Sequence, residues 1–109
     1  MPVERPGLSV VIRSKDEAPR LALTLAALEC QADGAEIVVV DDGSTDATPA
    51  IARAHGARVV SHAESLGNGA AVKRGIREAK GDWILLLDGD GQHPPQELRS
   101  TVTTAKPLR

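Results

Sequence analysis

Apolar residues recur along the chain with two periods, which predict alternating strands and helices. Short β-rich runs, typical of strands buried on both faces of a sheet, cover residues 8–12, 36–40, 58–61 and 83–87. Helical spacing covers 17–32, about 47–55 and 70–79, and a last helix is expected from Pro94 and Pro95 to about residue 101. This order predicts an α/β fold, a Rossmann-like parallel sheet with right-handed crossovers and helices on both faces.

Turn residues mark the ends of these elements. The segment DDGSTD, residues 41–46, offers Ser44, Thr45 and Asp46 as candidate N-caps of the second helix, and Gly56 suits the C′ position after it. We expect one domain over residues 1–109, with an ordered core over 7–101 and a frayed tail over 102–109. A sheet of this size is expected to leave one edge uncovered.

Composition narrows the class of protein. The 109 residues include a single aromatic, Trp83, so the core must consist of Ala, Val, Leu and Ile. A formal net charge of −2 argues against a nucleic-acid partner, because duplex binders present a basic face. The lone Cys30 cannot form an intrachain disulfide, and no apolar run is long enough to span a bilayer. We therefore expect a cytoplasmic protein. A longer homologue could in addition associate with a membrane.

Polar residues gather after three of the four predicted strands. In an open parallel sheet, ligands bind beyond the carboxyl ends of the strands, where the strand order reverses. So many carboxylates at one edge would repel each other unless a cation or a donor-rich ligand joined them. The residues are Arg13, Ser14, Lys15, Asp16 and Glu17 after the first strand, Asp41, Asp42 and Asp46 after the second, and Asp88, Asp90, Gln92 and His93 after the fourth.

Asp88-Gly89-Asp90 suggests a divalent metal site. Two carboxylates in a Gly-containing turn can converge on Mg²⁺ or Mn²⁺, which prefer oxygen ligands and leave positions open for phosphate oxygens. The alternative is a solvated turn whose aspartates cap the next helix. Asp41 and Asp42 could likewise accept a ring N–H of uracil or guanine, or simply be good turn residues.

The remaining charged candidates have simpler explanations. Lys73 and Arg74 lie on the third predicted helix, where they could approach phosphates but are equally explained as solvated surface charge. His55 and His62 are expected to be exposed residues in loops or at helix ends.

Taken together, three strings resemble the family 2 glycosyltransferases of GT-A fold, and within them the polyprenyl-phosphate sugar synthases. They are LSVVIRSKDEAPRL, EIVVVDDGSTDAT and LGNGAAVKRGIREAKGDWILLLDGDGQHPP, and the match runs from about residue 8 to residue 98. The resemblance implies the nucleotide-binding half of a GT-A fold, which binds a UDP- or GDP-linked sugar for inverting transfer. Asp88 and Asp90 would be the D-x-D pair that holds the diphosphate and Mg²⁺ or Mn²⁺, with Gln92 as a further metal ligand.

The same resemblance implies a nucleotide-sugar site at the carboxyl edge of the sheet. Asp41 and Asp42 would hold the nucleobase, Glu17 would match the acidic residue of the first motif, and Asn68, Gly69 and Gly75 would shape the third helix beside the donor. The full set of expected binding residues is Arg13, Lys15, Glu17, Asp41, Asp42, Asn68, Gly69, Lys73, Asp88, Gly89 and Asp90.

Two departures from the family pattern affect these expectations. Lys15 replaces the Tyr that usually packs on the nucleobase, so the resemblance does not specify which nucleobase binds. No residue within 1–109 is an evident catalytic base, and we expect that base and the acceptor half, for a polyprenyl phosphate or a glycan, beyond residue 109. The chain would then be a donor-binding module of low activity by itself, with a homo-oligomer as one way to cover the sheet edge.

Three other classes of protein share some of these features. A haloacid-dehalogenase-like phosphatase also places D-x-D after an apolar strand, but that motif usually opens its domain. A dinucleotide-binding Rossmann domain requires G-x-G-x-x-G directly after the first strand, whereas Gly67-Asn68-Gly69 follows the third. A non-catalytic nucleotide-sugar-binding module remains the main alternative to an enzyme.

Overall fold

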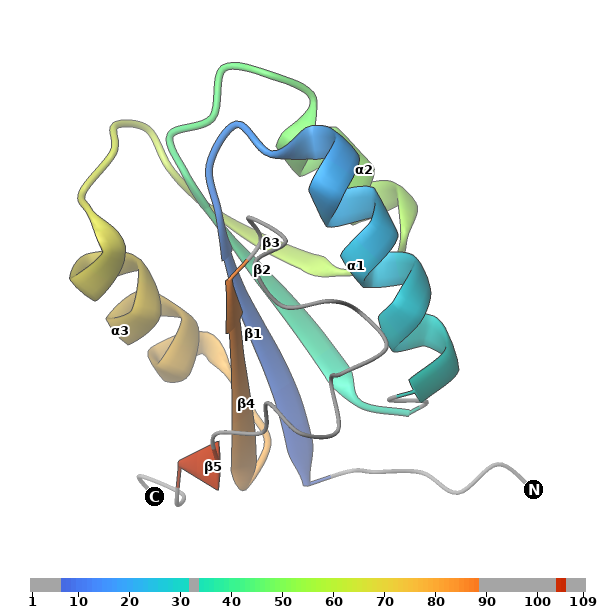
Figure 1. Ribbon diagram of the computed structural model, residues 1–109. Helices are drawn as coiled ribbons and strands as arrows, with labels where there is room; N and C mark the ends of the chain where they lie inside the picture. The colour runs from blue at the N-terminus through green and yellow to red at the C-terminus, as the bar shows by residue number, and fades with distance from the viewer. Residues whose placement is uncertain (1–6, 32–33, 89–103, 106–109) are drawn as a thin grey trace.

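The computed structural model describes residues 7–31, 34–88 and 104–105. Strands and helices alternate over most of this range, as the sequence pattern predicts (Figure 1). No helix in the described ranges is both long and apolar enough to cross a bilayer. The elements are β1 (Leu8–Ser14), α1 (Ala18–Gln31), β2 (Glu36–Asp42), α2 (Thr48–Ala54), β3 (Arg58–His62), α3 (Asn68–Glu78), β4 (Trp83–Asp88) and β5 (Thr104–Ala105).

The strands form one sheet in the order β3-β2-β1-β4-β5. The first four are parallel, and β5 runs antiparallel to β4. From β1 the chain adds β2 and then β3 on one side, and α3 carries it back across to place β4 on the other side of β1. The strand order therefore reverses between β1 and β4, which is where a parallel sheet of this kind forms a ligand crevice.

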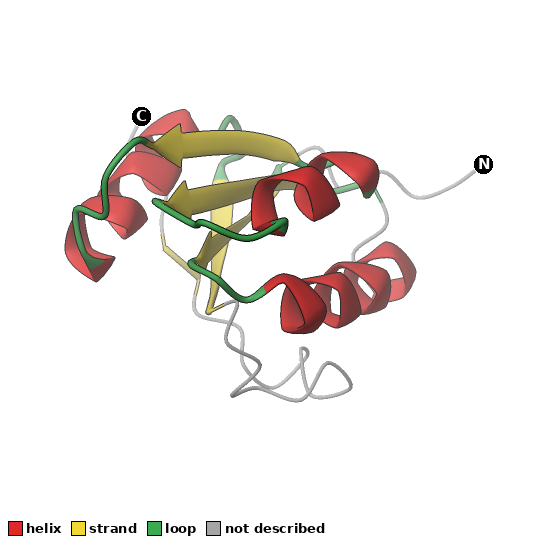
Figure 2. Cartoon of the chain, turned by 90° about the horizontal axis from the view of Figure 1, so that it is seen from above, coloured by secondary structure: helices red, strands yellow, loops and turns green. Residues whose placement is uncertain are grey.

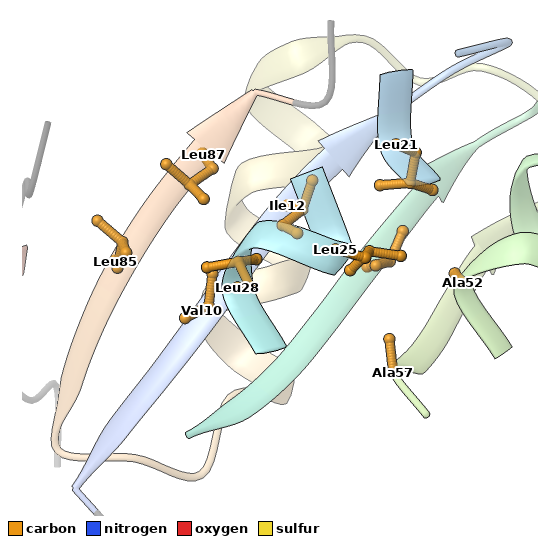
Figure 3. Close-up of a cluster of buried hydrophobic side chains, with 10 residues drawn as sticks. Val10, Ile12, Leu21, Leu25, Leu28, Ala52, Ala57, Leu85 and Leu87 are labelled. Atoms are coloured by element: carbon orange, nitrogen blue, oxygen red, sulfur yellow. The ribbon is translucent and has the colours of Figure 1, made fainter. Parts of the chain in front are cut away.

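Helices cover both faces of the sheet, α1 and α2 one face and α3 the other (Figures 1 and 2). The α1/α2 side holds a cluster of aliphatic side chains that includes Val10, Ile12, Leu21 and Leu25 (Figure 3). A second cluster under α3 includes Val11, Val38 and Val40. Trp83 is 48% exposed, so the described core is aliphatic, as the composition predicts.

Helix α2 ends as its sequence predicts, but it begins differently. Gly56 follows the C-cap His55 with φ +80°, Gly56 N–H donates to Arg53 O, and Ala57 N–H donates to Ala52 O, which together form a Schellman motif. At the other end the N-cap is Ala47, which makes no side-chain capping bond. Asp46, one residue earlier, accepts the Thr48 N–H at 2.9 Å.

Each predicted strand continues one or two residues past its expected end, because backbone pairing extends beyond the apolar run. The three described helices begin and end within two residues of their expected limits. The helix expected from residue 94 to about 101 lies outside the described residues. The expected frayed tail over 102–109 includes a short strand at Thr104–Ala105, because these two residues pair with Leu85 and Ile84 of β4. That pairing covers part of the β4 edge, and β3 forms the other edge of the sheet.

Candidate ligand site at the carboxyl edge of the sheet

The loops after β1 and β2 are fastened to each other by Asp16, which has a positive φ of 51°. Its Oδ1 accepts hydrogen bonds from Thr45 N–H at 2.7 Å, Asp46 N–H at 3.2 Å and Thr45 Oγ1 at 3.2 Å. In return Asp16 N–H donates to Ser44 Oγ at 2.8 Å. Four contacts between two loops nearly thirty residues apart hold the ends of both strands in one place.

Asp46 and Thr48 complete this fastening at the start of α1. Asp46 Oδ2 accepts the Ala18 N–H at 3.2 Å, and Thr48 Oγ1 accepts the Glu17 N–H at 3.1 Å. Thr48 Oγ1 also donates a short hydrogen bond to Asp46 Oδ1. The hydrogen bond from Thr48 Oγ1, together with bonds from backbone N–H groups, outweighs the opposing effect of burial and lowers the pKa of Asp46. Asp46 is thus an ionised link between the two helices.

Asp42, at the end of β2, is fastened to the loop between β3 and α3. Its Oδ1 accepts from His62 Nδ1 and from Leu66 N–H, both at 2.9 Å. Its Oδ2 accepts from Ser65 Oγ at 2.9 Å and from Gly67 N–H at 3.0 Å. A carboxylate offers about four lone-pair positions, so these four donors satisfy it.

These contacts determine the charge of Asp42. Its side chain is 3% exposed, and burial alone would raise its pKa. The hydrogen bonds from Leu66, His62, Ser65 and Gly67 outweigh burial and lower the pKa far below that of an ordinary aspartate. The group is therefore a permanent anion at neutral pH.

Gly43 allows the same loop to approach. It has φ +81°, and a Cβ at this position would lie 2.8 Å from Ser65 N. Any other residue would both strain the backbone and collide with the main chain of the loop. The Gly of the DDGS segment is thus explained by packing between two loops.

Asp41 differs from Asp42 in what its oxygens contact. It is 4% exposed, and its Oδ1 accepts the Ser44 N–H at 3.2 Å in a local turn. From the described residues, Oδ2 receives no hydrogen bond. Ser14, its partner in the β1–β2 register, is fully buried, and its Oγ has no hydrogen-bond partner in the described part of the chain. The two side chains retain hydrogen-bonding capacity next to each other.

Of the expected residues of the third loop and helix, Asn68 and Gly69 lie at the start of α3, whereas Lys73 and Gly75 lie farther along it. Gly67, with φ +94°, is the N-cap of α3, and Asn68 is its first residue. Lys73 is exposed on α3, whereas Arg74 contacts Glu78 at 3.5 Å, which accounts for Arg74 as a surface ion pair. Gly75 packs α3 onto the sheet, since a Cβ there would lie 2.2 Å from Val11 Cγ1.

The strand order brings Asp88, the first residue of the predicted metal-binding segment, to the switch point. β4 ends at Asp88, which pairs with Arg13 of β1. Lys15 follows β1 and is exposed, and Glu17 is half-buried before α1. Gly89, Asp90 and Gln92 lie outside the described residues, as does the side chain of Asp88. No group of three His, Cys, Asp or Glu side chains in the described ranges is placed to hold a metal ion.

The prediction for His62 was wrong. It was expected to be exposed, but its side chain is 7% exposed and bonded to Asp42. His62 is the last residue of β3 and pairs in register with Asp42, so an inward position follows from strand alternation once the register is known. His55, by contrast, lies at the end of α2, partly exposed, with Nδ1 at 2.8 Å from Glu29 Oε1.

An open parallel sheet with polar loops fastened along its carboxyl edge defines a Rossmann-like ligand-binding domain. Comparison with known sequences makes the class narrower, because residues 9–107 match the glycosyl transferase family 2 model. The chain therefore belongs to glycosyl transferase family 2.

Individual relatives agree with this assignment. The undecaprenyl-phosphate 4-deoxy-4-formamido-L-arabinose transferase of Edwardsiella ictaluri is 36% identical over 90% of this chain and 33% of its own length. A mannosyltransferase of Pyrobaculum calidifontis, solved with GDP-Man and Mn²⁺, superposes with a TM-score of 0.75 at 28% identity, over 91% of this chain and 32% of that one. Glucosyl-3-phosphoglycerate synthase of Mycobacterium tuberculosis, solved with UDP, gives 0.69 at 32% identity, over 79% and 34%. The chain spans about a third of the length of each.

Proposed function

We propose that this chain is the donor-binding part of an inverting glycosyltransferase and binds a nucleotide-diphosphate sugar together with a divalent metal. The observation that carries the proposal is the carboxyl edge of the sheet, where Asp16, Asp42 and Asp46 fasten three loops into one surface. Asp41 lies within that surface with one oxygen unengaged by the described residues. The solved relatives that hold UDP or GDP-Man support a nucleotide as the ligand.

In this proposal the nucleobase lies at the ends of β1 and β2. A ring N–H of uracil or guanine would donate to Asp41 Oδ2, or would replace one of the four donors on Asp42. Ser14 Oγ, beside Asp41, is available to a base carbonyl or to a bridging water. Arg13, Lys15 and Lys73 supply positive charge for the diphosphate, and Asn68 and Gly69 form the first turn of α3 beside it.

The metal in this proposal is Mg²⁺ or Mn²⁺, held by Asp88, Asp90 and Gln92. The donor set fits, because all three side chains offer oxygen ligands, and β4 delivers Asp88 next to β1 at the switch point. When bound, the metal supplies positive charge that stabilises the diphosphate leaving group. The chain's own contribution is to hold the nucleotide at the ends of β1, β2 and β4.

The acceptor in this proposal is a polyprenyl phosphate. The name of the Edwardsiella ictaluri relative, an undecaprenyl-phosphate transferase, supports it. A glycan is the other acceptor that the family resemblance allows. The base that deprotonates the acceptor would come from a part of the enzyme beyond residues 1–109.

Titration calorimetry with UDP, GDP and their sugar conjugates, with and without Mn²⁺, tests the nucleotide site. We expect one nucleotide to bind in a metal-dependent way, and Asp90→Ala to abolish the metal dependence. Asp82→Ala is a matched control, since Asp82 is an exposed carboxylate next to the opposite end of β4. A folded protein that binds none of these nucleotides would contradict the proposal, as would equal losses for Asp82→Ala and Asp90→Ala.

A further inference from the structure

β3 ends in a buried imidazole that lies beside a buried carboxylate. His62 and Asp42 are register partners on parallel strands, and both side chains point to the α3 side of the sheet, the side of Val40 and Val60. His62 Nδ1 lies 2.9 Å from Asp42 Oδ1, and the two side chains are 7% and 3% exposed. A carboxylate is an acceptor only, so the imidazole is the donor in this pair.

The carboxylate that His62 contacts also binds three successive loop residues. Ser65 Oγ, Leu66 N–H and Gly67 N–H all donate to it, at 2.9 to 3.0 Å. Gly67 is the N-cap of α3, so the loop leads directly into the first turn of that helix. The orientation of one carboxylate thus determines where α3 begins relative to the end of β2.

A buried pair of this kind is costly to desolvate, and an apolar pair of similar size would often be as stable. What the polar pair provides is direction, because hydrogen bonds to a carboxylate have a preferred geometry whereas aliphatic contacts do not. The pair occupies the strand end at the ligand edge, where the position of a loop matters most. One register pair farther from that edge, the same face of the sheet carries Val40 and Val60, which make aliphatic contacts.

We propose that His62 is a positioning residue of the nucleotide site, which orients Asp42 and thereby holds residues 65–67 and the N-terminus of α3 at the carboxyl edge of the sheet. This inference rests on the proposed function, because the site that it positions is the proposed nucleotide site. His62 acts through Asp42 and the loop, with no contact to the ligand required.

Two substitutions separate the donor from the bulk of the side chain. His62→Asn places an amide N–H near the position of Nδ1 and keeps the bond to Asp42, whereas His62→Leu fills similar space without a donor. His55→Leu is the matched control, because His55 also contacts a carboxylate, Glu29, but at the amino end of the sheet. For each variant we would measure affinity for UDP and GDP with Mn²⁺ by calorimetry, and amide hydrogen exchange at Leu66 and Gly67 by NMR without nucleotide.

The expected result is that His62→Leu weakens nucleotide binding roughly three- to tenfold, the worth of about one net hydrogen bond. The same variant should exchange the Leu66 and Gly67 amides faster by a similar factor. His62→Asn should restore both values to near those of the wild type, and His55→Leu should change neither.

Three outcomes would overturn the inference. The first is unchanged exchange at Leu66 and Gly67 in a folded His62→Leu variant. The second is a His62→Leu variant that binds nucleotide as well as a wild type that binds it. The third is a His62→Asn variant that loses as much affinity as His62→Leu. If the wild type binds no nucleotide, the proposed function fails, and the inference that His62 positions a nucleotide site fails with it. The exchange data then still show whether His62 holds the loop.

Discussion

Four aspartates lie at the end of β2 or in the loops after β1 and β2 in the described structure, and they differ in what their oxygens contact. Asp16 and Asp46 accept backbone N–H groups from the neighbouring βα loop and hold the first two loops together. Asp42 does the same for the loop before α3. Among the described residues, Asp41 accepts the Ser44 N–H in a local turn. At this scale, most of the acidic edge is explained by loop attachment, and Asp41 is the buried aspartate with acceptor capacity left for a ligand.

The pH dependence of stability should reflect Asp42. Its pKa is lowered in the folded state, so the unfolded chain binds its proton more readily, and the stabilisation is present above the unfolded pKa of about 3.9 and lost as pH falls further. Asp46 acts in the same direction. We expect Asp42→Asn to cost about 1–3 kcal/mol at pH 7, because donors around the site lose an ionised acceptor. Its loss of stability between about pH 4 and pH 2 should be smaller than in the wild type.

Urea unfolding followed by circular dichroism over pH 2–7 measures both effects. Asp82→Asn serves as the control, because Asp82 is exposed. If Asp42→Asn and the wild type gave parallel profiles, the hydrogen bonds to Asp42 would not be the source of the acid sensitivity.

Among the elements, α3 makes the closest approach to the sheet, and Gly75 is the reason. A Cβ there would lie 2.2 Å from Val11 Cγ1 and 3.1 Å from Val40 Cγ2. Both valines are fully buried in the middle of central strands and cannot move aside freely. The position of α3 above β1 and β2 therefore depends on the absence of one methyl group.

Gly75→Ala should destabilise the domain by about 1–3 kcal/mol through overpacking. Gly69→Ala, two turns earlier on the same helix, is the matched control, because nothing lies within 4 Å of its Cβ position. There alanine should be neutral or stabilise by roughly 0.5–1 kcal/mol, since it lowers the entropy of the unfolded chain. Denaturant midpoints at pH 7 decide the matter, and a Gly75→Ala midpoint equal to that of Gly69→Ala would refute the packing argument.

At the scale of the whole molecule, the carboxyl edge of the sheet is formed by the loops that follow β1, β2 and β3. These three loops lie far apart in the sequence. A ligand bound there contacts segments that are brought together only in the folded state. Binding should therefore stabilise the entire domain rather than one loop.

We expect the preferred nucleotide with Mn²⁺, at a hundred times its Kd, to raise the Tm by roughly 10–20 °C. Ligand at a hundred times its Kd stabilises the folded state by ~2.7 kcal/mol, and a domain near 100 residues gains about 4–8 °C per kcal/mol at its midpoint. Differential scanning fluorimetry measures the shift, and EDTA should remove most of it. A shift that persists in EDTA would mean that nucleotide binding does not require the metal.

The order and type of the elements follow from the sequence because their causes are local. Val-rich runs, the Gly56 stop and the DDGSTD turn act within a few residues, and the strands begin where the apolar runs begin. That ligand-binding residues would gather at one edge also follows, since parallel strands all end at the same side of a sheet. The sequence also predicts Asp16 and Ser14 at that edge, but the pattern contains no sign of which of their oxygens accept hydrogen bonds.

The tertiary structure decided the contacts that depend on strand order and register. Asp42 meets His62, Ser65, Leu66 and Gly67 because β2 and β3 pair with residue 42 opposite residue 62, which packing across the whole sheet determines. The position of β4 beside β1, which creates the switch point, depends on α3 running back across the sheet. Gly75 allows α3 to pack closely on the sheet as it does so. Local periodicity carries no information about residues twenty or more positions apart, so it predicted the elements and the edge, and the fold decided which side chains bind one another.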